Sequence, residues 1–339
     1  MLMCSRSLSQ LFAAGVALAV LAHAAPASAS PWTLPQDELV IGFNYTYQGA
    51  TSEYLADGTY QDFPLEGQFL SHTMHIGSRY GFTPRFEGAV DLVFKQVTYQ
   101  ALPLILGGPD EGSALSAWND SIIDFNTVRL GAGDFHFHGR YNLRRGLVMI
   151  TSETSIKLPT GYEQPQGTFD EMTGEVRGQA TMGDGQTDLT QSLLVGAYVP
   201  ATGGFARLDM GLRLRFGSPG HQAVAGAKIG QPLGSNLVVF AGARGHYTLT
   251  EGEQIGVTMV AVDPAVARSQ FSLANVRAVP LRLDSDQLTL EGGALIRLGT
   301  IELAVNYGYT AWGRNTAAVH SLTIGTGFAI PNATASTAE

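Results

Sequence analysis

Phe205-Ala206-Arg207-Leu208-Asp209-Met210-Gly211-Leu212-Arg213-Leu214-Arg215-Phe216 alternates large apolar residues with charged or small ones over its whole length. Side chains of a β-strand point alternately to its two faces, so one face of this segment is apolar and the other is charged. Soluble antiparallel sheets contain such strands, and so do membrane β-barrels, in which the apolar face meets lipid and the charges face the lumen. The rest of the sequence favours the membrane barrel.

The same alternation recurs along the chain. Leu39, Ile41, Phe43, Tyr45 and Tyr47 alternate with small or polar residues in one such segment. Tyr and Trp also gather near segment ends, where the aromatic girdles of membrane barrels lie. We therefore predict an all-β, antiparallel up-and-down transmembrane barrel of about twelve strands. The expected strands are 38–48, 68–80, 86–99, 128–142, 147–158, 187–199, 205–216, 221–231, 236–250, 286–298, 300–312 and 318–330.

The connections between these strands are sorted by length. Short turns are expected at 80–84, 142–146, 200–204, 231–236 and 298–300. Long loops are expected at 49–67, 100–127, 159–186 and 251–285, with 217–220 and 313–317 as short exceptions and an additional hairpin allowed at 268–282. Short turns at one rim and long loops at the other are typical of outer-membrane barrels, whose even strand number puts both chain ends on the periplasmic side.

The first thirty residues have the pattern of an export signal. Arg6 precedes an apolar core at 11–21, and Ala27-Ser28-Ala29 forms a cleavage site. That core is too short for a membrane-spanning helix. We therefore expect residues 1–30 to be a cleaved signal peptide, 31–330 to be a barrel in a Gram-negative type of outer membrane, and 331–339 to be a polar tail.

Composition narrows the expected partners. The formal charge is −9, and removing a signal that holds Arg6 and no acid makes it −10, which disfavours nucleic acid. The only cysteine, Cys4, lies within the signal, so the mature chain has no thiol chemistry. We expect outer-membrane lipid and a small-molecule solute as partners and no cofactor; the sequence leaves the oligomeric state and the solute open.

Charged and polar side chains of both signs fall on the expected inward faces. They would be strongly destabilising in lipid. Two interpretations stay open: a set of salt bridges that fills the lumen, or a solute path. The candidate lumen residues are Asp134, His136, His138, Arg140, Glu153, Lys157, Arg207, Asp209, Arg213, Arg215, Lys228, Arg244, His246 and Glu291, together with Glu87, Asp91, Lys95, Arg297 and Glu302.

Catalytic and metal sites find little support in the sequence. His136 and His138 share a strand face, but no third metal ligand is evident, and two ordinary lumen histidines are favoured. The pairs Ser71-His72 and His320-Ser321 are adjacent, so their members point to opposite faces, and the chain has no His-x-Ser motif of the kind that the outer-membrane phospholipase uses. We expect no enzyme.

Three stretches resemble one known family. Gly131-Ala132-Gly133-Asp134 followed by Arg140-Tyr141 is similar to the G-x-G-D…R-Y segment of the "MetA-pathway of phenol degradation" family. Lys157-Leu158-Pro159-Thr160-Gly161 resembles its K-x-P-T-G strand end, and Gly183-Asp184-Gly185-Gln186-Thr187-Asp188 resembles its G-x-G-x-x-D segment.

The resemblance implies an outer-membrane barrel that passes small hydrophobic or aromatic compounds, loosely related to the fatty-acid transporter FadL. One departure concerns the N-terminus. FadL-type barrels carry an N-terminal hatch, whereas here the first expected strand begins at residue 38, close behind the cleavage site.

The leading functional hypothesis is a passive channel for small solutes. The alternatives are a closed structural or binding barrel with surface loops, or a lipid-modifying enzyme. Charges of opposite sign should pair across so small a lumen, with Asp209 or Glu291 as the expected partner of Arg213, and leave a narrow path. The cations Arg207, Arg213, Arg215, Lys228 and Arg244 should favour anions or polarisable aromatic solutes.

Overall fold

The computed structural model describes residues 31–105, 122–162, 164–165, 182–263 and 275–330. The expected signal at 1–30 and the expected tail at 331–339 lie outside these residues. Across the described ranges, no helix is long and apolar enough to cross a membrane.

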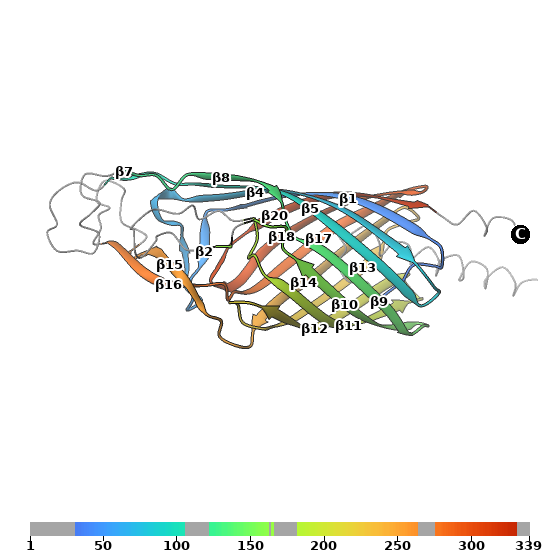
Figure 1. Cartoon of the computed structure of the whole chain (residues 1–339). Helices are drawn as coiled ribbons and strands as arrows, with labels where there is room; N and C mark the ends of the chain where they lie inside the picture. Colours follow the sequence, from blue (N-terminus) through green and yellow to red (C-terminus); the bar gives the residue numbers. More distant parts are fainter. Residues whose placement is uncertain (1–30, 106–121, 163, 166–181, 264–274, 331–339) are drawn as a thin grey trace, which may run out of the picture.

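The chain forms a closed antiparallel β-barrel of 12 strands, as the sequence predicts (Figure 1). The barrel closes because the first strand pairs with both the second and the last. Two consecutive segments, β8 and β9, both pair with β5 and together act as one barrel strand. The barrel strands are β1 (Leu39–Ala50), β4 (Gln68–Gly81), β5 (Phe86–Gln100), β8 (Thr127–Ala132) with β9 (Phe135–Arg144), β10 (Val148–Leu158), β11 (Thr187–Val199), β12 (Gly204–Phe216), β13 (Gln222–Pro232), β14 (Leu237–Thr248), β17 (Asp286–Leu298), β18 (Ile301–Arg314) and β20 (His320–Ile330).

Each expected strand matches an observed strand to within a few residues. The reason is that the alternation of apolar and polar side chains is a local property of each strand, so it does not depend on which strands become its neighbours. The start of β1 and the end of β20 lie at the rim that carries the short turns, which we call the turn rim (Figure 1). The opposite rim, the loop rim, carries the long connections.

Additional strands extend beyond the loop rim. β15 (Gln254–Ala261) and β16 (Val276–Arg282) form a hairpin arm. The sequence allowed such an arm at 268–282, but its first strand begins earlier, at Gln254, and the arm spans more of the 251–285 connection than expected. The other short strands are β2 (Ser52–Tyr54), β3 (Tyr60–Asp62) and β19 (Thr316–Ala317), which form a small sheet, and the pair β6 (Leu104–Ile105) and β7 (Ile122–Ile123).

The outside of the barrel is apolar and the inside is polar. On β12, Leu208, Met210 and Leu212 are 44%, 47% and 55% exposed, whereas the alternate residue Arg215 is 6% exposed. In this barrel the apolar faces of the strands point to the exterior, and such an exposed apolar band fits a hydrocarbon environment and not water.

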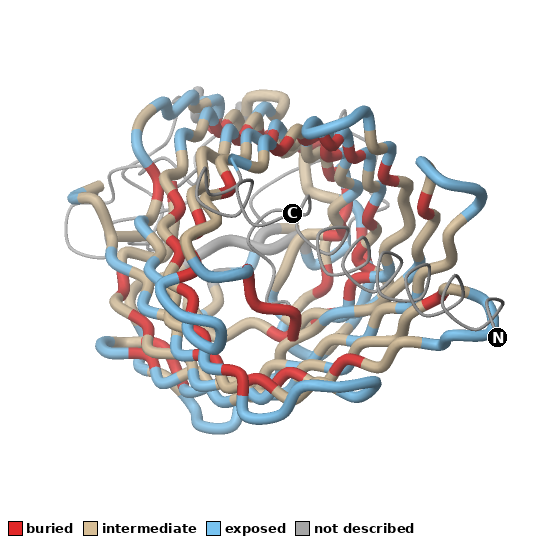
Figure 2. Tube along the Cα trace, turned by 90° about the vertical axis from the view of Figure 1, so that its right-hand side faces the viewer, coloured by how far each residue is buried: buried red, intermediate tan, exposed pale blue. Residues whose placement is uncertain are grey.

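The segment that precedes β1 turns into the barrel. Residues 31–34 are all buried, and Figure 2, which looks at the turn rim, shows a continuous buried stretch inside the ring of strands. Leu34 is 0% exposed and Trp32 is 6% exposed. The sequence indicated no N-terminal hatch because strand β1 follows the signal so closely; the structure shows that a few residues are enough to occupy the turn-rim end of the lumen. We call residues 31–36 the N-terminal segment.

Candidate functional site: the barrel lumen

The N-terminal segment is held by the inward faces of several strands. The Pro31 carbonyl accepts hydrogen bonds from Thr151 Oγ1 at 2.6 Å and Asn142 Nδ2 at 3.3 Å. The Trp32 ring packs edge-on against Phe205, with 5.7 Å between ring centroids. Gly196 makes room for this packing, since a Cβ atom there would lie 2.5 Å from Pro31 and 3.0 Å from Trp32. The segment therefore covers the β9–β12 side of the lumen at the turn rim.

A ladder of ion pairs lies behind the segment. Glu87 accepts from Arg79 Nε at 2.7 Å and from Arg140 Nη1 at 2.9 Å, and Arg140 also binds Glu153. The Leu34 backbone N–H donates to the second Glu87 oxygen at 2.8 Å. These carboxylates and guanidinium groups are buried, so each depends on its partner. The ladder ties the N-terminal segment to the strand wall and closes this part of the lumen.

His136 and His138 belong to the same wall. His138 Nε2 lies 3.2 Å from Asp91 Oδ2, and the two imidazole rings are nearly parallel with centroids 6.2 Å apart. In the part of the chain that the structure describes, no group of three or more His, Cys, Asp or Glu residues could hold a metal ion. The two histidines therefore extend the ladder toward the middle of the barrel.

Two tight ion pairs occupy the middle of the wall. Arg207 binds the Asp209 carboxylate with its Nε at 2.8 Å from both oxygens. Lys228 Nζ lies 2.9 Å from Glu291 Oε1 and 4.6 Å from the centre of the Phe240 ring. The sequence proposed Asp209 or Glu291 as partners of Arg213, and this was wrong: both carboxylates have nearer partners. Arg213 instead donates to Gln222 Oε1 at 2.9 Å.

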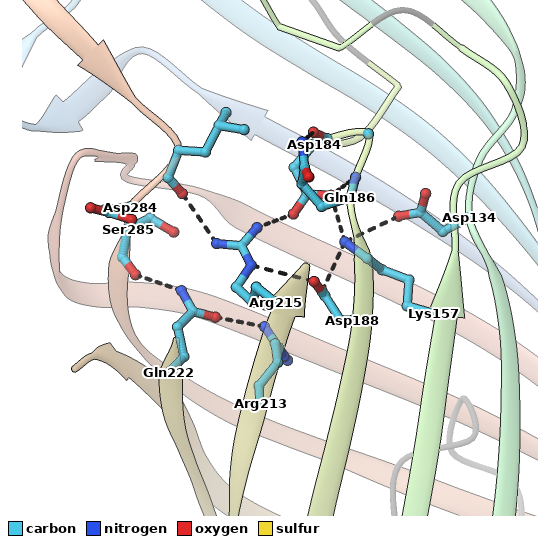
Figure 3. A network of polar contacts seen from close by, with 12 residues as sticks. Asp134, Lys157, Asp184, Gln186, Asp188, Arg213, Arg215, Gln222, Asp284 and Ser285 are labelled. Carbon is cyan, nitrogen blue, oxygen red and sulfur yellow. Dashed lines mark hydrogen bonds and ion pairs between the residues drawn. The ribbon is translucent and has the colours of Figure 1, made fainter. Parts of the chain in front are cut away.

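The three motif segments meet at the loop rim (Figure 3). Lys157 Nζ lies 2.5 Å from Asp184, 2.9 Å from Asp188 and 3.9 Å from Asp134. Thr160 Oγ1 donates to the carbonyl of Gly133 at 2.6 Å. Segments that are far apart in the sequence thus share one network, which we call the rim network.

The rim network holds the turn at 183–186 against the mouth of the barrel. Arg215 binds Asp184 and lies 3.5 Å from Asp188 (Figure 3). Burial raises the pKa of Asp184, but Lys157 and Arg215 lower it more, so that it lies below its ordinary value. The turn needs its glycines: Gly185 has a φ of +70°, and a Cβ atom on Gly183 would lie 2.1 Å from the Tyr162 hydroxyl. Of the other motif glycines, Gly131 is the last residue but one of β8, and Gly161, with a φ of +88°, lies three residues beyond the end of β10.

A second set of contacts at the loop rim was missed by sequence reasoning. The Asp284 carboxylate accepts the backbone N–H groups of Gly220 and Gly252, both at 2.7 Å. Asp286 binds Arg314 and the backbone N–H of Thr248. The sequence shows the polar run Asp284-Ser285-Asp286 at the start of β17. Which loops these side chains bind is decided only when the barrel closes and brings the loops beside them.

The wall formed by β1, β18 and β20 has a different character. Apart from Glu302, which Arg297 binds at 2.6 Å near the turn rim, its inward residues are uncharged and mostly small, and the hydroxyl groups of Thr46 and Thr323 lie 2.9 Å apart. Gly327 faces inward, and a Cβ atom there would meet nothing within 4 Å. Its partner on β1 is Gly42, where a Cβ atom would meet only a carbonyl oxygen at 3.8 Å. Space therefore remains on this side, away from the N-terminal segment. The small uncharged residues that face the lumen on this wall include Gly42, Asn44, Thr46, Ala304, Asn306, Gly308, Ser321, Thr323, Gly325 and Gly327.

The adjacent histidine–serine pairs point to opposite faces, as expected. Ser71 is 0% exposed and faces the lumen, whereas His72 lies outside with its Nδ1 2.7 Å from the Tyr45 hydroxyl. His320 lies outside in the same way, 2.5 Å from the Tyr307 hydroxyl. These histidines are part of the aromatic band near the loop rim, and neither lies on the same face as the serine beside it.

The chain was compared with protein-family models, with curated proteins and with solved structures. No family model matches the chain, and no curated protein matches it. The resemblance to the MetA-pathway family therefore stays a prediction.

Solved structures do share the fold. The COG4313 outer-membrane channel from Pseudomonas putida F1 has a TM-score of 0.58 and 11% identity, covering 88% of this chain and 97% of that one. The translocator domain of the autotransporter NalP from Neisseria meningitidis is more distant, with a TM-score of 0.42 and 14% identity over 96% and 95% of the chains. The CymD monoaromatic hydrocarbon channel has a TM-score of 0.42 and 9% identity over 91% and 94%. The first of these likenesses identifies the fold of this chain as that of an outer-membrane β-barrel.

Proposed function

We propose that the protein is a passive outer-membrane channel for small solutes. The motif resemblance suggests aromatic or hydrophobic compounds as the solute class. In this proposal the turn rim faces the periplasm and the loop rim faces the outside, as in other barrels with sorted loops. The observation that carries the proposal is the open space beside Gly327 and Gly42, on a wall that neither the N-terminal segment nor the ion-pair ladder covers.

The proposed path is narrow and one-sided. The walls from β4 through β17 hold most of the long charged side chains, and the N-terminal segment packs against part of them. The β1, β18 and β20 wall holds mostly glycine, alanine, serine, threonine and asparagine, with Glu302 near the turn rim. On the second wall a solute meets the buried carboxylate of Glu302, which lies opposite Gly327 and is bound by Arg297 at 2.6 Å, and otherwise mostly uncharged groups. As long as that ion pair stays intact, the desolvation cost of passage along this wall stays small.

Filling the open space tests this path. Gly327→Trp adds a large ring where a Cβ atom meets nothing within 4 Å, so the barrel should fold and the path should narrow. We expect the uptake of small sugars and aromatic acids into proteoliposomes to fall severalfold.

The matched control is Gly139→Trp. Gly139 faces the exterior, where its Cβ atom would have only an ordinary contact of 3.8 Å with Phe86. This variant should transport as the unaltered protein does. Equal transport by Gly327→Trp and Gly139→Trp would contradict the path along β20.

A closed structural barrel is the second candidate. The ladder at the turn rim and the rim network at the loop rim both favour it, because buried, mutually bonded charges rigidify a lumen. Proteoliposomes decide between the two: a closed barrel passes neither ions nor small solutes with or without the Gly327 substitution.

A further inference from the structure

We infer that Arg213 and Arg244 are two successive binding positions for the carboxylate group of a small organic acid in the lumen. The inference deepens the proposed function and rests on it in one respect, namely that the solute reaches the lumen. It concerns the β12–β14 wall between the two rims, where Arg213 and Arg244 belong neither to the ladder nor to the rim network nor to the three motifs.

The two arginines lie on one wall, on either side of His246. Arg213 pairs with Gln222 across the β12–β13 ladder, and Arg244 pairs with Gly226 across the β13–β14 ladder. Four ladder rows along the strands and two strands across the sheet separate them, roughly 17 Å between Cα atoms by standard strand spacings. They are therefore two positions along a path and not one chelating pair.

The other basic residues of this wall are closely neutralised. Arg207 binds Asp209, Lys228 lies 2.9 Å from Glu291, and Arg215 binds Asp184. The charge of each of these cations is neutralised by the carboxylate that it binds. They cannot bind a solute anion without giving up a buried partner, which is strongly unfavourable.

Arg213 differs from them. Of the described residues, none forms an ion pair with Arg213, and its one hydrogen bond goes to the neutral amide oxygen of Gln222 at 2.9 Å. Its ladder neighbours on both sides, Thr190 and Gln222, are uncharged. Several guanidinium donors thus remain available for a second acceptor.

Arg244 differs in exposure. Its side chain is 62% exposed although it points inward, whereas that of Lys228 is 15% exposed. Its Nε lies 3.9 Å from Glu291, a carboxylate that Lys228 already binds. Its ladder neighbours are Gly226 and Thr289, so no long side chain covers it. Arg244 is therefore both hydrated and only weakly paired.

A carboxylate fits this arrangement because guanidinium groups bind it with two parallel hydrogen bonds. Two weakly neutralised positions in sequence also fit a conducting path, in which each site must be strong enough to bind and weak enough to release. His246 lies between them in the ladder, paired with Val224, and its Nε2 lies 3.2 Å from the Ser285 hydroxyl.

The test uses benzoate as the probe. Planar bilayers with a potassium benzoate gradient give the permeability ratio of benzoate to potassium, and calorimetric titration of the detergent-solubilised protein measures binding directly. The double variant Arg213→Gln, Arg244→Gln should lower both the ratio and the affinity about tenfold, the loss expected for charge-assisted hydrogen bonds. Arg213→Lys with Arg244→Lys should keep most of the ratio.

The matched control removes a neutralised pair. Arg207→Gln with Asp209→Asn leaves the net charge of the lumen unchanged, so it should leave the ratio unchanged. Gel mobility with and without heating shows whether each variant has folded.

The outcomes separate the two proposals. If the protein conducts and the glutamine double variant has the same ratio and affinity, the anion positions are refuted and the channel stands. If the protein binds benzoate through the two arginines but conducts nothing, the channel is refuted and the anion positions stand. If it conducts but shows no benzoate binding, the inference is likewise overturned.

Discussion

Replacing Trp32 by alanine should free the N-terminal segment from the lumen. The indole is 6% exposed and packs on Phe205 at 5.7 Å. Truncating a tryptophan at such a packed site costs ~3–5 kcal/mol. The barrel strands form their own closed hydrogen-bonded ladder, so this cost falls on the seated position of the segment and not on the barrel. It corresponds to a shift of roughly two to four orders of magnitude in the ratio of seated to released segment.

Two measurements follow the released segment. Single-channel recording should show a larger or more frequent open state in Trp32→Ala. A cysteine in place of Thr151, whose hydroxyl otherwise donates to the Pro31 carbonyl at 2.6 Å, should react faster with a small thiol reagent in the Trp32→Ala background. The midpoint of barrel unfolding should change little.

Trp312→Ala is the matched control, since that indole is 41% exposed on the outside of β18. It removes the same side chain without touching the lumen, so conductance and labelling should stay as they are. If Trp32→Ala and Trp312→Ala have the same conductance and the same labelling rate, the Trp32 side chain does not hold the segment in the lumen.

Three further predictions concern facing, topology and pH. Leu212→Arg should destabilise the barrel by ~2–4 kcal/mol in lipid-vesicle unfolding, because Leu212 is 55% exposed on the outer face, whereas Arg213→Leu should fold; equal destabilisation by both would show that the faces are misassigned. A cysteine at Asp57 should react with a bulky thiol reagent on intact cells and one at Thr83 should not, and the reverse result would invert the topology. The pKa of Asp184 is depressed below its ordinary 3.8, so the stabilisation it gives the rim network is complete at neutral pH and is lost as the pH falls through that depressed value. Protease cleavage after the 183–186 turn should therefore rise only in strong acid, and a rise near pH 6 would contradict the assignment.

Strand positions, facing and the sorting of loops were all predictable from the sequence. Leu208, Met210 and Leu212 point outward, and Arg207 and Arg215 point inward, because alternation along a strand is a local property that does not depend on which strands become neighbours. The barrel class followed in the same way, since strands with an apolar outer face need a closed sheet in lipid, where no water can satisfy a free edge.

The partners of the inward charges depended on the tertiary structure. Arg213 faces Gln222 and not Asp209 or Glu291, because the register of β12 with β13 sets which side chains lie within reach. The meeting of Lys157 with Asp184 and Asp188 has the same origin: a turn and two strands become neighbours only when the barrel forms.

The N-terminal segment gives the clearest contrast. Its sequence, Pro31-Trp32-Thr33-Leu34, is too short to show any periodicity, and nothing in it indicates where it lies. Its place is decided by Gly196, Phe205 and Glu87 on three separate strands. The sequence by itself determined the wall of this protein because a strand's two faces are encoded residue by residue. The contents of the lumen were decided only by the tertiary structure, because a site built from several strands exists only after closure and register have brought them together.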